Sequence, residues 1–396
     1  MAGRPLALWP GARLTGPLHG TAREEAARTG GRGGRGGNVV EGRRVLVTGI
    51  AGELAGMVAR ALEERDDVLE IVGIDVREPQ HDLRRTEFVR ADLRNPLVAR
   101  VLEAAAIDTV LHLSTTSAPR EAGGRSSMKE RNVIGAMQLA AACQKAPALR
   151  RFVLKSTTAV YGSDHTDPAL FREEATPRTP PRGGFGKDAT EIEGYVRALG
   201  RRRDDVDVTI LRFANFVGPR VDSAFHSLFS LPVLPTVAGF DPRLQFCHED
   251  DAVAVLRQVA LGDHPGIVNV AGDGVLYLSQ CVRLAGRVAA PVPWPFVSGL
   301  ARLMRQAGRA DVSLDQLRVL QFGRVVDTGR LGEELGFTPR YSTRAAFEDF
   351  VHRRRLQGVI DRGEVVRWER EVYDFLQRKG QERFLDARRA HREDVR

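Results

Sequence analysis

Short apolar runs alternate with longer amphipathic stretches from residue 44 to residue 218. The runs are rich in Val, Ile and Leu and occupy residues 45–49, 70–75, 87–92, 109–114, 151–156 and 208–213. Strands separated by helical segments predict βαβ units, and nearly continuous apolar strands are typical of a parallel sheet covered on both faces. The pattern therefore predicts an α/β fold built on a doubly wound parallel sheet.

The regular alternation stops after the sixth run. Prolines become frequent, and we expect a smaller, irregular region over residues 219–345, with residues 264–272 returning to the sheet. Residues 346–396 carry mixed charges and are predicted to form a charged helical extension. Residues 1–42 are rich in Gly and Arg and nearly free of aromatic residues, which predicts a disordered leader before a sheet domain of residues 43–218.

The formal net charge of +8 is concentrated toward the ends of the chain. Residues 1–44 carry eight Arg against three Glu, whereas the middle of the chain is close to neutral. A near-neutral body makes a nucleic-acid partner the less favoured interpretation, although the Gly/Arg leader leaves RNA binding open as an alternative. The basic residues include only five Lys, at positions 129, 145, 155, 187 and 379.

Cysteine spacing and hydropathy narrow the class further. Cys143, Cys247 and Cys281 lie far apart without metal-ligand spacing, which predicts buried free thiols and no metal. We find no apolar segment of the roughly 18 residues needed to span a bilayer, and the first residues do not resemble a signal peptide. The sequence thus predicts a cytoplasmic protein with no membrane partner.

A glycine-rich turn follows the first apolar run and opens a helix. Such a turn lets the backbone approach a pyrophosphate, and the helix N-terminus offers amide N–H groups to the anion. Ala55 stands where the third glycine of this pattern is usual, and it is small enough for helix–strand packing. The candidate cofactor-binding residues of the turn are Gly49, Ile50, Ala51, Gly52, Glu53 and Leu54.

Asp75 ends the second apolar run, about 20 residues after the turn. A carboxylate at this position accepts hydrogen bonds from the adenosine ribose and repels a 2′-phosphate, so NAD is favoured over NADP. Arg77 lies nearby and keeps NADP open as an alternative. Alternatively, the glycine turn has only a structural role, in an α/β fold that binds no ligand there. We predict a Rossmann domain that binds NAD.

Several short motifs follow one another along the chain in the order that is typical of one protein family. They lie at residues 48–52, 91–93, 112–114, 132–136, 156–162, 211–215 and 218–219. With them, roughly residues 44–345 resemble the extended short-chain dehydrogenases/reductases, the NAD-dependent nucleotide-sugar epimerases and dehydratases. The chain looks like a high-GC bacterial branch often labelled UDP-glucose 4-epimerase-like. The resemblance implies an enzyme, acting as an isomerase or oxidoreductase, that moves hydride at a sugar carbon and recycles its NAD. It also implies a nucleotide sugar or related small molecule as ligand, and a homodimer is common in the family.

The resemblance assigns roles to residues outside the glycine turn. It implies that Asp92 and Leu93 contact the adenine and that Leu113 and Ser114 line the nicotinamide side. It places Asn132 on a helix behind the active site. Taken alone, Asp92 could instead cap the helix that begins near residue 95, and Asn132 could be a surface polar residue. The resemblance further implies that Phe213 contacts the cofactor and that Asn215 contacts the substrate.

Thr157 matches the catalytic Ser/Thr of the family and lies just past an apolar run. Its hydroxyl could bind a sugar oxygen during hydride transfer; alternatively it is a β-branched residue suited to a strand. Thr158 is a candidate substrate contact. In the 4,6-dehydratases of the family an Asp-Glu pair follows the catalytic Ser/Thr. Thr158 and Ala159 carry no carboxylate here, which argues against a sugar dehydratase.

The family's Tyr-x-x-x-Lys pair is incomplete in this chain. Lys187 fits the lysine, with a catalytic and a cofactor-binding role, but the tyrosine position is Gly183. That tyrosine is the general acid/base of the family, and a positioned acid/base contributes about 10²–10⁴ in rate. Tyr161 and Tyr195 are the only tyrosines between residues 150 and 200, and neither has the expected spacing.

His248 to Asp251 resemble a metal cluster by composition, but their register matches a family segment with carboxylates at a helix start. Three functional hypotheses remain: an NAD-dependent nucleotide-sugar epimerase; an NAD(H)-binding scaffold with reduced catalysis, serving as sensor or partner; and an NAD-dependent dehydrogenase/reductase of a small hydroxy or keto compound.

Overall fold

The computed structural model describes residues 42–117, 124–177, 180–181, 184–297, 299, 314–354 and 356. The predicted leader, apart from Gly42, lies outside this described part. So does the predicted C-terminal extension beyond residue 356, and so does Gly183. None of the described helices is long and apolar enough to cross a membrane.

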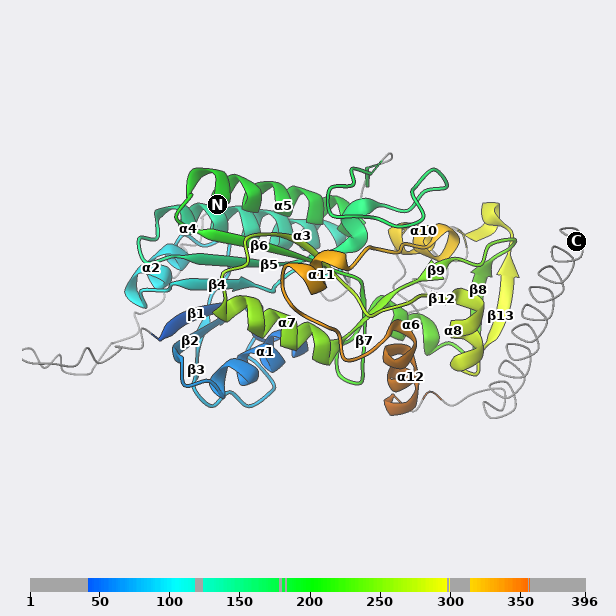
Figure 1. Ribbon diagram of the computed structural model, residues 1–396, viewed down its shortest axis with the longest axis horizontal. Helices are drawn as coiled ribbons and strands as arrows, with labels where there is room; N and C mark the ends of the chain where they lie inside the picture. Colours follow the sequence, from blue (N-terminus) through cyan, green and yellow to red (C-terminus); the bar gives the residue numbers. More distant parts are fainter. Residues whose placement is uncertain are drawn as a thin grey trace, which may run out of the picture. The chain divides into compact units, whose positions relative to one another are not determined.

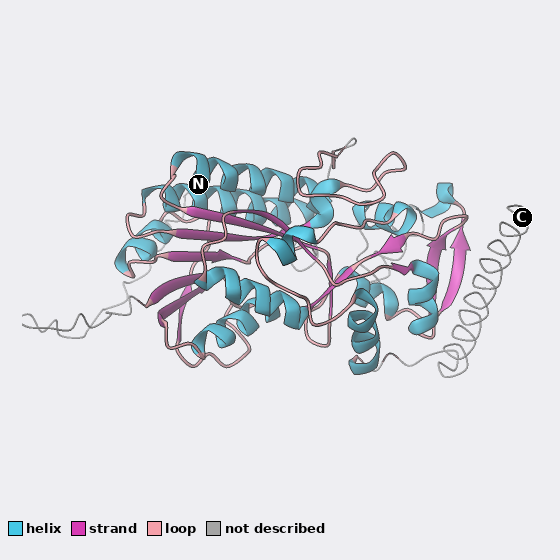
Figure 2. Ribbon diagram, viewed as in Figure 1, coloured by secondary structure: helices cyan, strands magenta, loops and turns pink. Residues whose placement is uncertain are grey.

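Seven strands form a central sheet, drawn as the layer of arrows in Figures 1 and 2. Every neighbouring pair in it is parallel, and the strand order is β11-β6-β5-β4-β1-β2-β3. The order reverses between β1 and β4, which is where ligands bind in open α/β sheets. The α/β fold predicted from the apolar runs is confirmed. The strands are β1 (Arg43–Thr48), β2 (Val68–Asp75), β3 (Thr86–Arg90), β4 (Thr109–His112), β5 (Arg151–Thr157), β6 (Asp207–Phe213) and β11 (Gly266–Val270).

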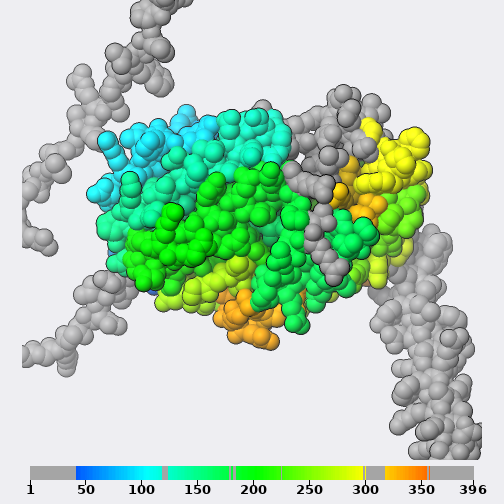
Figure 3. All heavy atoms as spheres, turned by 90° about the horizontal axis from the view of Figure 1, so that it is seen from above, coloured from blue at the N-terminus to red at the C-terminus, as the bar shows by residue number. Residues whose placement is uncertain are grey.

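Helices cover both faces of this sheet (Figure 1). α1 (Glu53–Glu63) and α7 (Glu249–Leu261) pack on one face, where Val47, Val153 and Leu211 belong to a shared core. The opposite core lies under α2 (Leu97–Ala104), α4 (Gly135–Lys145) and α5 (Gly184–Arg202). The space-filling view shows the α4 and α5 segments adjoining on that second face (Figure 3). Successive strand residues alternate between the two cores, as a pleated strand requires.

A second, smaller region follows β6. It holds three two-stranded pairs: β7 (Asn215–Val217) with β10 (Phe246–His248), β9 (Arg243–Leu244) with β12 (Leu276–Tyr277), and β8 (Val233–Val237) with β13 (Val288–Val292). An aromatic core lies among them, with Phe225, Phe229, Phe246, Phe347 and Phe350 all buried. Among the described residues, this region includes α6 (Ala224–Phe229), α8 (Leu278–Leu284), α10 (Leu314–Phe322) and α12 (Thr343–Arg353), whereas α11 (Gly329–Glu333) packs against β11 of the central sheet.

Candidate functional site

The glycine turn lies at the carboxyl end of β1, in the middle of the sheet. Gly49 has φ +75°, and a Cβ there would lie 2.6 Å from the Cα of Ser114, which follows β4. Only glycine accommodates both the backbone angle and this approach. Gly52 is the N-cap of α1 and has no side chain to accept from the first helix amides. The helix N-terminus is therefore open to an anion.

Asp75 lies at the end of the neighbouring strand β2 and faces the same turn. Its carboxylate accepts hydrogen bonds from the amides of Ala51 (3.2 Å) and Arg77 (3.0 Å). Ile50 is fully buried, and the absence of a side chain at Gly73 makes room for it, because a Cβ there would lie 2.7 Å from the Ile50 side chain. The turn and Asp75 are thus joined into one unit. Glu53 is exposed in the first turn of α1, and Leu54 is buried.

Asp92 and Leu93 follow β3. Arg94 donates from its backbone amide and guanidinium to the Asp92 carboxylate, with the shortest contact at 2.6 Å, and its guanidinium also bonds Glu130. The Arg94 hydrogen bond lowers the pKa of Asp92 more than desolvation raises it. Leu93 is partly buried against the core under α4. The predicted contact of these residues with adenine stays a prediction.

His112 and Thr48 fix the end of β4. The Thr48 hydroxyl accepts the amide proton of Leu113 (3.1 Å) and lies 2.9 Å from His112 Nδ1. The other ring nitrogen, Nε2, is buried and has no hydrogen-bond partner among the described residues. Burial, followed by the nearby Lys155 charge, lowers the pKa of His112 to about 3. Leu113 is buried, whereas Ser114 is half-buried beside Gly49.

Asn132 holds the segment that continues from β4. It lies in a short π-helix, Glu130–Ile134, and is buried. Its side-chain oxygen accepts from the amide of Thr116 (3.1 Å), and its side-chain nitrogen donates to the Thr116 carbonyl (2.8 Å). Asn132 is thus an internal clamp on the strand end rather than a surface residue.

Thr157 ends β5 and is level with Phe213 of β6 in the strand register. It is half-buried, and its hydroxyl accepts the amide proton of Ala159 (3.2 Å) at the start of a 3₁₀ turn, Thr158–Tyr161. Thr158 and Phe213 are buried. The structure therefore brings Thr157 and Phe213 together, while Asn215 lies two residues further on and pairs with β10.

The start of α5 adjoins this turn, since a Cβ at Gly186 would lie 2.6 Å from the Ala159 carbonyl oxygen. Lys187 is exposed in the first turn of α5. The next residue, Asp188, is buried and receives two hydrogen bonds from Arg125, at 2.6 and 2.7 Å. This pair holds the helix that carries Lys187. Gly183 precedes it, outside the described residues.

Tyr161 is enclosed in a buried polar network and is not available as a replacement acid/base. Its hydroxyl donates to Asn269 Oδ1 (2.8 Å) and accepts from Arg212 (2.8 Å), and burial raises its pKa. Arg212 in turn pairs with Glu193 at 2.7 Å. Tyr195 lies two turns along α5 from Lys187, about 12 Å at 1.5 Å per residue.

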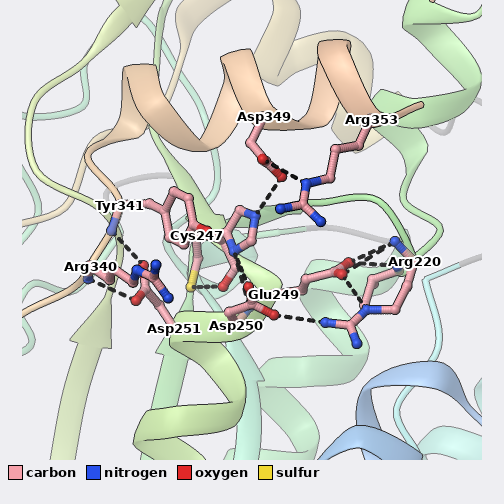
Figure 4. Close-up of polar contacts among 11 residues, drawn as sticks. Arg220, Cys247, Glu249, Asp250, Asp251, Arg340, Tyr341, Asp349 and Arg353 are labelled. Carbon is pink, nitrogen blue, oxygen red and sulfur yellow. Dashed lines mark hydrogen bonds and ion pairs between the residues drawn. The ribbon is translucent and has the colours of Figure 1, made fainter. Parts of the chain in front are cut away.

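The segment from His248 links α7 to α12 (Figure 4). His248 Nδ1 accepts the amide proton of Asp250 (3.1 Å), Nε2 lies 3.2 Å from the Asp349 carboxylate, and the ring stacks on Tyr341. Asp251 accepts the amide protons of Arg340 and Tyr341. Every member thus has a structural partner, and we find no metal-binding group of His, Cys, Asp and Glu in the described part of the chain.

Glu249 braces the loop that follows β7 (Figure 4). Its buried carboxylate accepts from the amides of Arg220 (3.0 Å) and Val221 (2.8 Å) and from the Arg220 guanidinium (2.8 Å). A Cβ at Gly218 would lie 2.4 Å from the same carboxylate. The acidic helix start therefore fixes the path of the chain from the sheet into the second region.

Lys155 is a site residue that the sequence analysis missed. It lies in β5, two residues before Thr157, and its amino group donates to the carbonyl of Thr115 (3.1 Å). The sequence carries a signal for it, because this lysine directly follows the apolar residues 152–154 in a strand of a sheet that is covered on both faces.

Comparison with known proteins places this geometry in context. The model of the NAD dependent epimerase/dehydratase family matches residues 45–271. Rv0501 of Mycobacterium tuberculosis (strain ATCC 25618 / H37Rv), an uncharacterized protein, is 44% identical over 340 residues, which cover 85% of this chain and 90% of the relative. The UDP-glucose 4-epimerase of Thermotoga maritima, solved with UDP-glucose, shares the fold with TM-score 0.62 and 18% identity, over 79% of this chain and 98% of that chain. MoeE5, solved with UDP-glucose and NAD, has TM-score 0.61 and 20% identity, over 79% and 98%.

Proposed function

Because the chain belongs to the NAD-dependent epimerase/dehydratase family, we propose that it binds NAD at the carboxyl edge of its sheet and acts on a nucleotide sugar, as a 4-epimerase that recycles its cofactor. The observation that carries this proposal is the arrangement of the strand ends. The glycine turn after β1, Asp75 at the end of β2 and Thr157 at the end of β5 share one edge of a parallel sheet.

The glycine turn and its neighbours fit the dinucleotide. The close approach of Gly49 to Ser114 leaves a cradle that any side chain would fill, and the uncapped start of α1 offers amides to a pyrophosphate. Asp75 has a second lone pair on each oxygen for the ribose hydroxyls of adenosine. Lys187 and Phe213 would bound the other end of the cofactor. When bound, NAD supplies an acceptor and a donor of hydride at the sugar carbon.

The β5 end favours an epimerase over a dehydratase. The Thr157 hydroxyl is half-exposed and already oriented by the Ala159 amide, so it can donate its proton to a sugar oxygen. The following residues, Thr158 and Ala159, offer no carboxylate for acid–base work at a neighbouring carbon. Asn215 and Thr158 are the proposed substrate contacts beside it.

A second candidate function is an NAD(H)-binding protein without turnover. The observation that favours it is the position of the tyrosines. Tyr161 is locked between Arg212 and Asn269, and Tyr195 lies two helical turns from Lys187. With glycine at position 183, the usual acid/base hydroxyl is missing from the sequence.

Purified full-length protein tests both candidates. NAD(H) is measured first, by extraction and by titration with fluorescence. Conversion of UDP-galactose to UDP-glucose is then followed without added cofactor. Conversion supports the epimerase. NAD binding without conversion of UDP-hexoses supports the binding protein, and a stoichiometric demand for NAD⁺ points to a dehydrogenase. Failure to bind NAD at all would contradict the proposal.

A further inference from the structure

The interior of β5 contains one charged side chain on the face that α1 and α7 cover. Lys155 lies two residues after Val153, so the two side chains project from the same face of the strand. Val153 belongs to the core of that face. Its amino group donates to the carbonyl oxygen of Thr115, and the Thr115 hydroxyl donates back to the Lys155 carbonyl (3.4 Å). An ammonium group has three protons to donate, and one of them is used by this recorded bond. The residue is half-buried.

The described residues around Lys155 provide no carboxylate that pairs with its amino group. On β4, His112 is the titratable neighbour, and it is neutral because its pKa lies at about 3. On β6, the nearby residues Leu211 and Phe213 are apolar and buried. Within the described residues, no ion pair of Lys155 is recorded. Desolvation lowers the pKa of Lys155 to about 8, close to neutral pH.

The carboxylates of the covering helix α7 are engaged elsewhere. Glu249 accepts from the backbone amides of Arg220 and Val221, and Asp251 accepts from those of Arg340 and Tyr341. The part of α7 that packs on the sheet core is apolar: Ala252, Val255, Leu256, Val259 and Ala260. Within the described residues, these α7 carboxylates are therefore not paired with Lys155.

Lys155 and Thr157 lie two residues apart near the carboxyl end of β5, so their side chains project from the same face of the strand. His112 pairs with Leu154, so Thr115 and Thr157 each lie three residues past the same paired position. Lys155 reaches across to the backbone of Thr115, at the edge where Thr157 offers its hydroxyl. The amine and the hydroxyl thus project from one face of β5, and the amine contacts the segment that follows β4 at the same edge of the sheet.

Resting on the proposed function, we propose that Lys155 is the catalytic acid/base of this site and performs the proton transfer that the tyrosine performs in related enzymes. As the sugar hydroxyl is oxidised, its O–H bond breaks and the proton moves to the neutral amine, forming ammonium. The C–H hydrogen leaves with its electron pair to NAD⁺, the oxidant, and a C=O bond forms. On return of hydride to the carbonyl carbon, the ammonium gives its proton back to the oxygen.

Two other buried groups are less suited to this transfer. His112 has a pKa far below neutral, so its imidazole does not hold a second proton, and its ring faces Thr48. The Tyr161 hydroxyl is held by Arg212 and Asn269, and burial raises its pKa. Lys155 combines a pKa close to neutral pH with free donor capacity at the site.

Competitive labelling tests the placement of Lys155 without requiring turnover. The full chain is treated with trace acetic anhydride between pH 6 and 10, and each lysine is quantified by peptide mass spectrometry. Lys129 and Lys145 are exposed and serve as references for reagent access. We expect half-maximal labelling of Lys155 near pH 8, and about tenfold protection when NAD⁺ is present at ten times its Kd. Labelling that NAD⁺ leaves unchanged, or no labelling while the references react, would overturn the inference.

Substitution then tests proton transfer. Lys155→Arg keeps the positive charge and a hydrogen-bond donor but cannot release a proton near neutral pH. We expect UDP-hexose conversion to fall by about 10² or more, with NAD⁺ affinity within about threefold of wild type. Lys155→Met should lose conversion similarly and serves as the uncharged comparison. Lys145→Arg, at the exposed end of α4, is the matched control and should convert normally.

The outcomes separate this inference from the proposed function. A wild-type protein that binds no NAD contradicts the proposed function. Conversion by wild type that survives in Lys155→Arg, with its pH profile unchanged, contradicts the inference about Lys155 alone. Loss of conversion in Lys155→Arg, with NAD⁺ still bound and the remaining conversion no longer rising as the pH increases through about 8, supports it.

Discussion

The two ends of the proposed site, one for adenosine and one for catalysis, differ in how they are built. The adenosine end is continuous in sequence: β1, the glycine turn, α1 and β2 contain the turn, the helix N-terminus and Asp75 within residues 43–75. The catalytic end draws on β4, β5, β6 and α5, which are spread over residues 109–213. The first depends on backbone angles and the second on side chains that meet only after folding. A change of one residue therefore alters the catalytic chemistry without disturbing the adenosine end.

The largest effect should come from breaking the buried ion pair of the catalytic end. Glu193 and Arg212 have side chains that are 1% and 7% exposed. Glu193→Ala leaves the Arg212 charge buried without its partner, and we expect the free energy of unfolding to fall by about 3–5 kcal/mol. Denaturant unfolding measures this. The control is Glu348→Ala, which removes the exposed Arg344 pair and should cost less than about 1 kcal/mol.

If the two ends are independent, NAD⁺ affinity of the folded Glu193→Ala protein should stay within about threefold of wild type. A parallel loss of NAD⁺ affinity would show that the buried network of the catalytic end also shapes the adenosine end. Binding is measured by fluorescence titration under conditions where the variant remains folded.

A smaller effect is expected from a side chain at the glycine turn. Gly49→Ala places a Cβ against Ser114 at a positive φ, which should destabilise the fold by about 1–3 kcal/mol. NAD⁺ affinity should fall by more than about tenfold, because the cradle is filled. Gly194→Ala is the matched control: a Cβ in that part of α5 meets no atom within 4 Å, and the change should stabilise the protein by about 0.5–1 kcal/mol. Tight NAD⁺ binding by Gly49→Ala would contradict the proposed position of the pyrophosphate.

The difference between the two ends also explains what the sequence could predict. The order of apolar runs was enough to predict the sheet, because each run overlaps a strand of it. The glycine turn and Asp75 could be recognised in the sequence because the residues that they contact are near them along the chain. For example, the Ala51 amide donates to the Asp75 carboxylate. The position of Thr157 followed from the strand end that carries it.

Other features depend on distant partners and could not be read in the same way. The Asn132 clamp on Thr116, the Tyr161 network with Asn269, and the His248 contact with Asp349 join residues far apart along the chain. No local pattern records which side chain a buried hydroxyl will meet. Lys155 could be noticed in the sequence as a charge that follows apolar strand residues. Its contact with Thr115, however, depends on the β4–β5 register.

Asp75→Ala tests the adenosine end of the proposed site. Removing hydrogen bonds to a charged carboxylate should weaken NAD⁺ binding by about 1.5–3 kcal/mol, or roughly tenfold to a hundredfold in Kd. Discrimination against NADP⁺ should also narrow, because the carboxylate that repels the 2′-phosphate is gone. Titration with both cofactors measures this, and Glu78→Ala, which removes an exposed carboxylate on the following loop, is the control. Unchanged NAD⁺ affinity in Asp75→Ala would contradict the assignment of the ribose site.

The smallest effect concerns Asp92, whose carboxylate is held by Arg94. Because this hydrogen bond lowers the pKa of Asp92 below its ordinary value, the stabilisation is fully present at pH values above that ordinary pKa. It is lost as the pH falls through the lower pKa of the folded protein. Asp92→Asn should therefore lower stability at pH 7 by less than about 1 kcal/mol, and the difference from wild type should shrink as the pH falls through the lowered pKa of Asp92 in the folded protein. Denaturant unfolding across this pH range tests the pair.

NAD⁺ titration of Asp92→Asn and Arg94→Ala then separates the two roles of Asp92. If the Asp92 carboxylate contacts the adenine, Asp92→Asn should weaken NAD⁺ binding. Arg94→Ala frees the carboxylate and should not weaken it. Equal loss in both variants would mean that the Arg94 pair shapes the loop and that the carboxylate itself does not contact the cofactor.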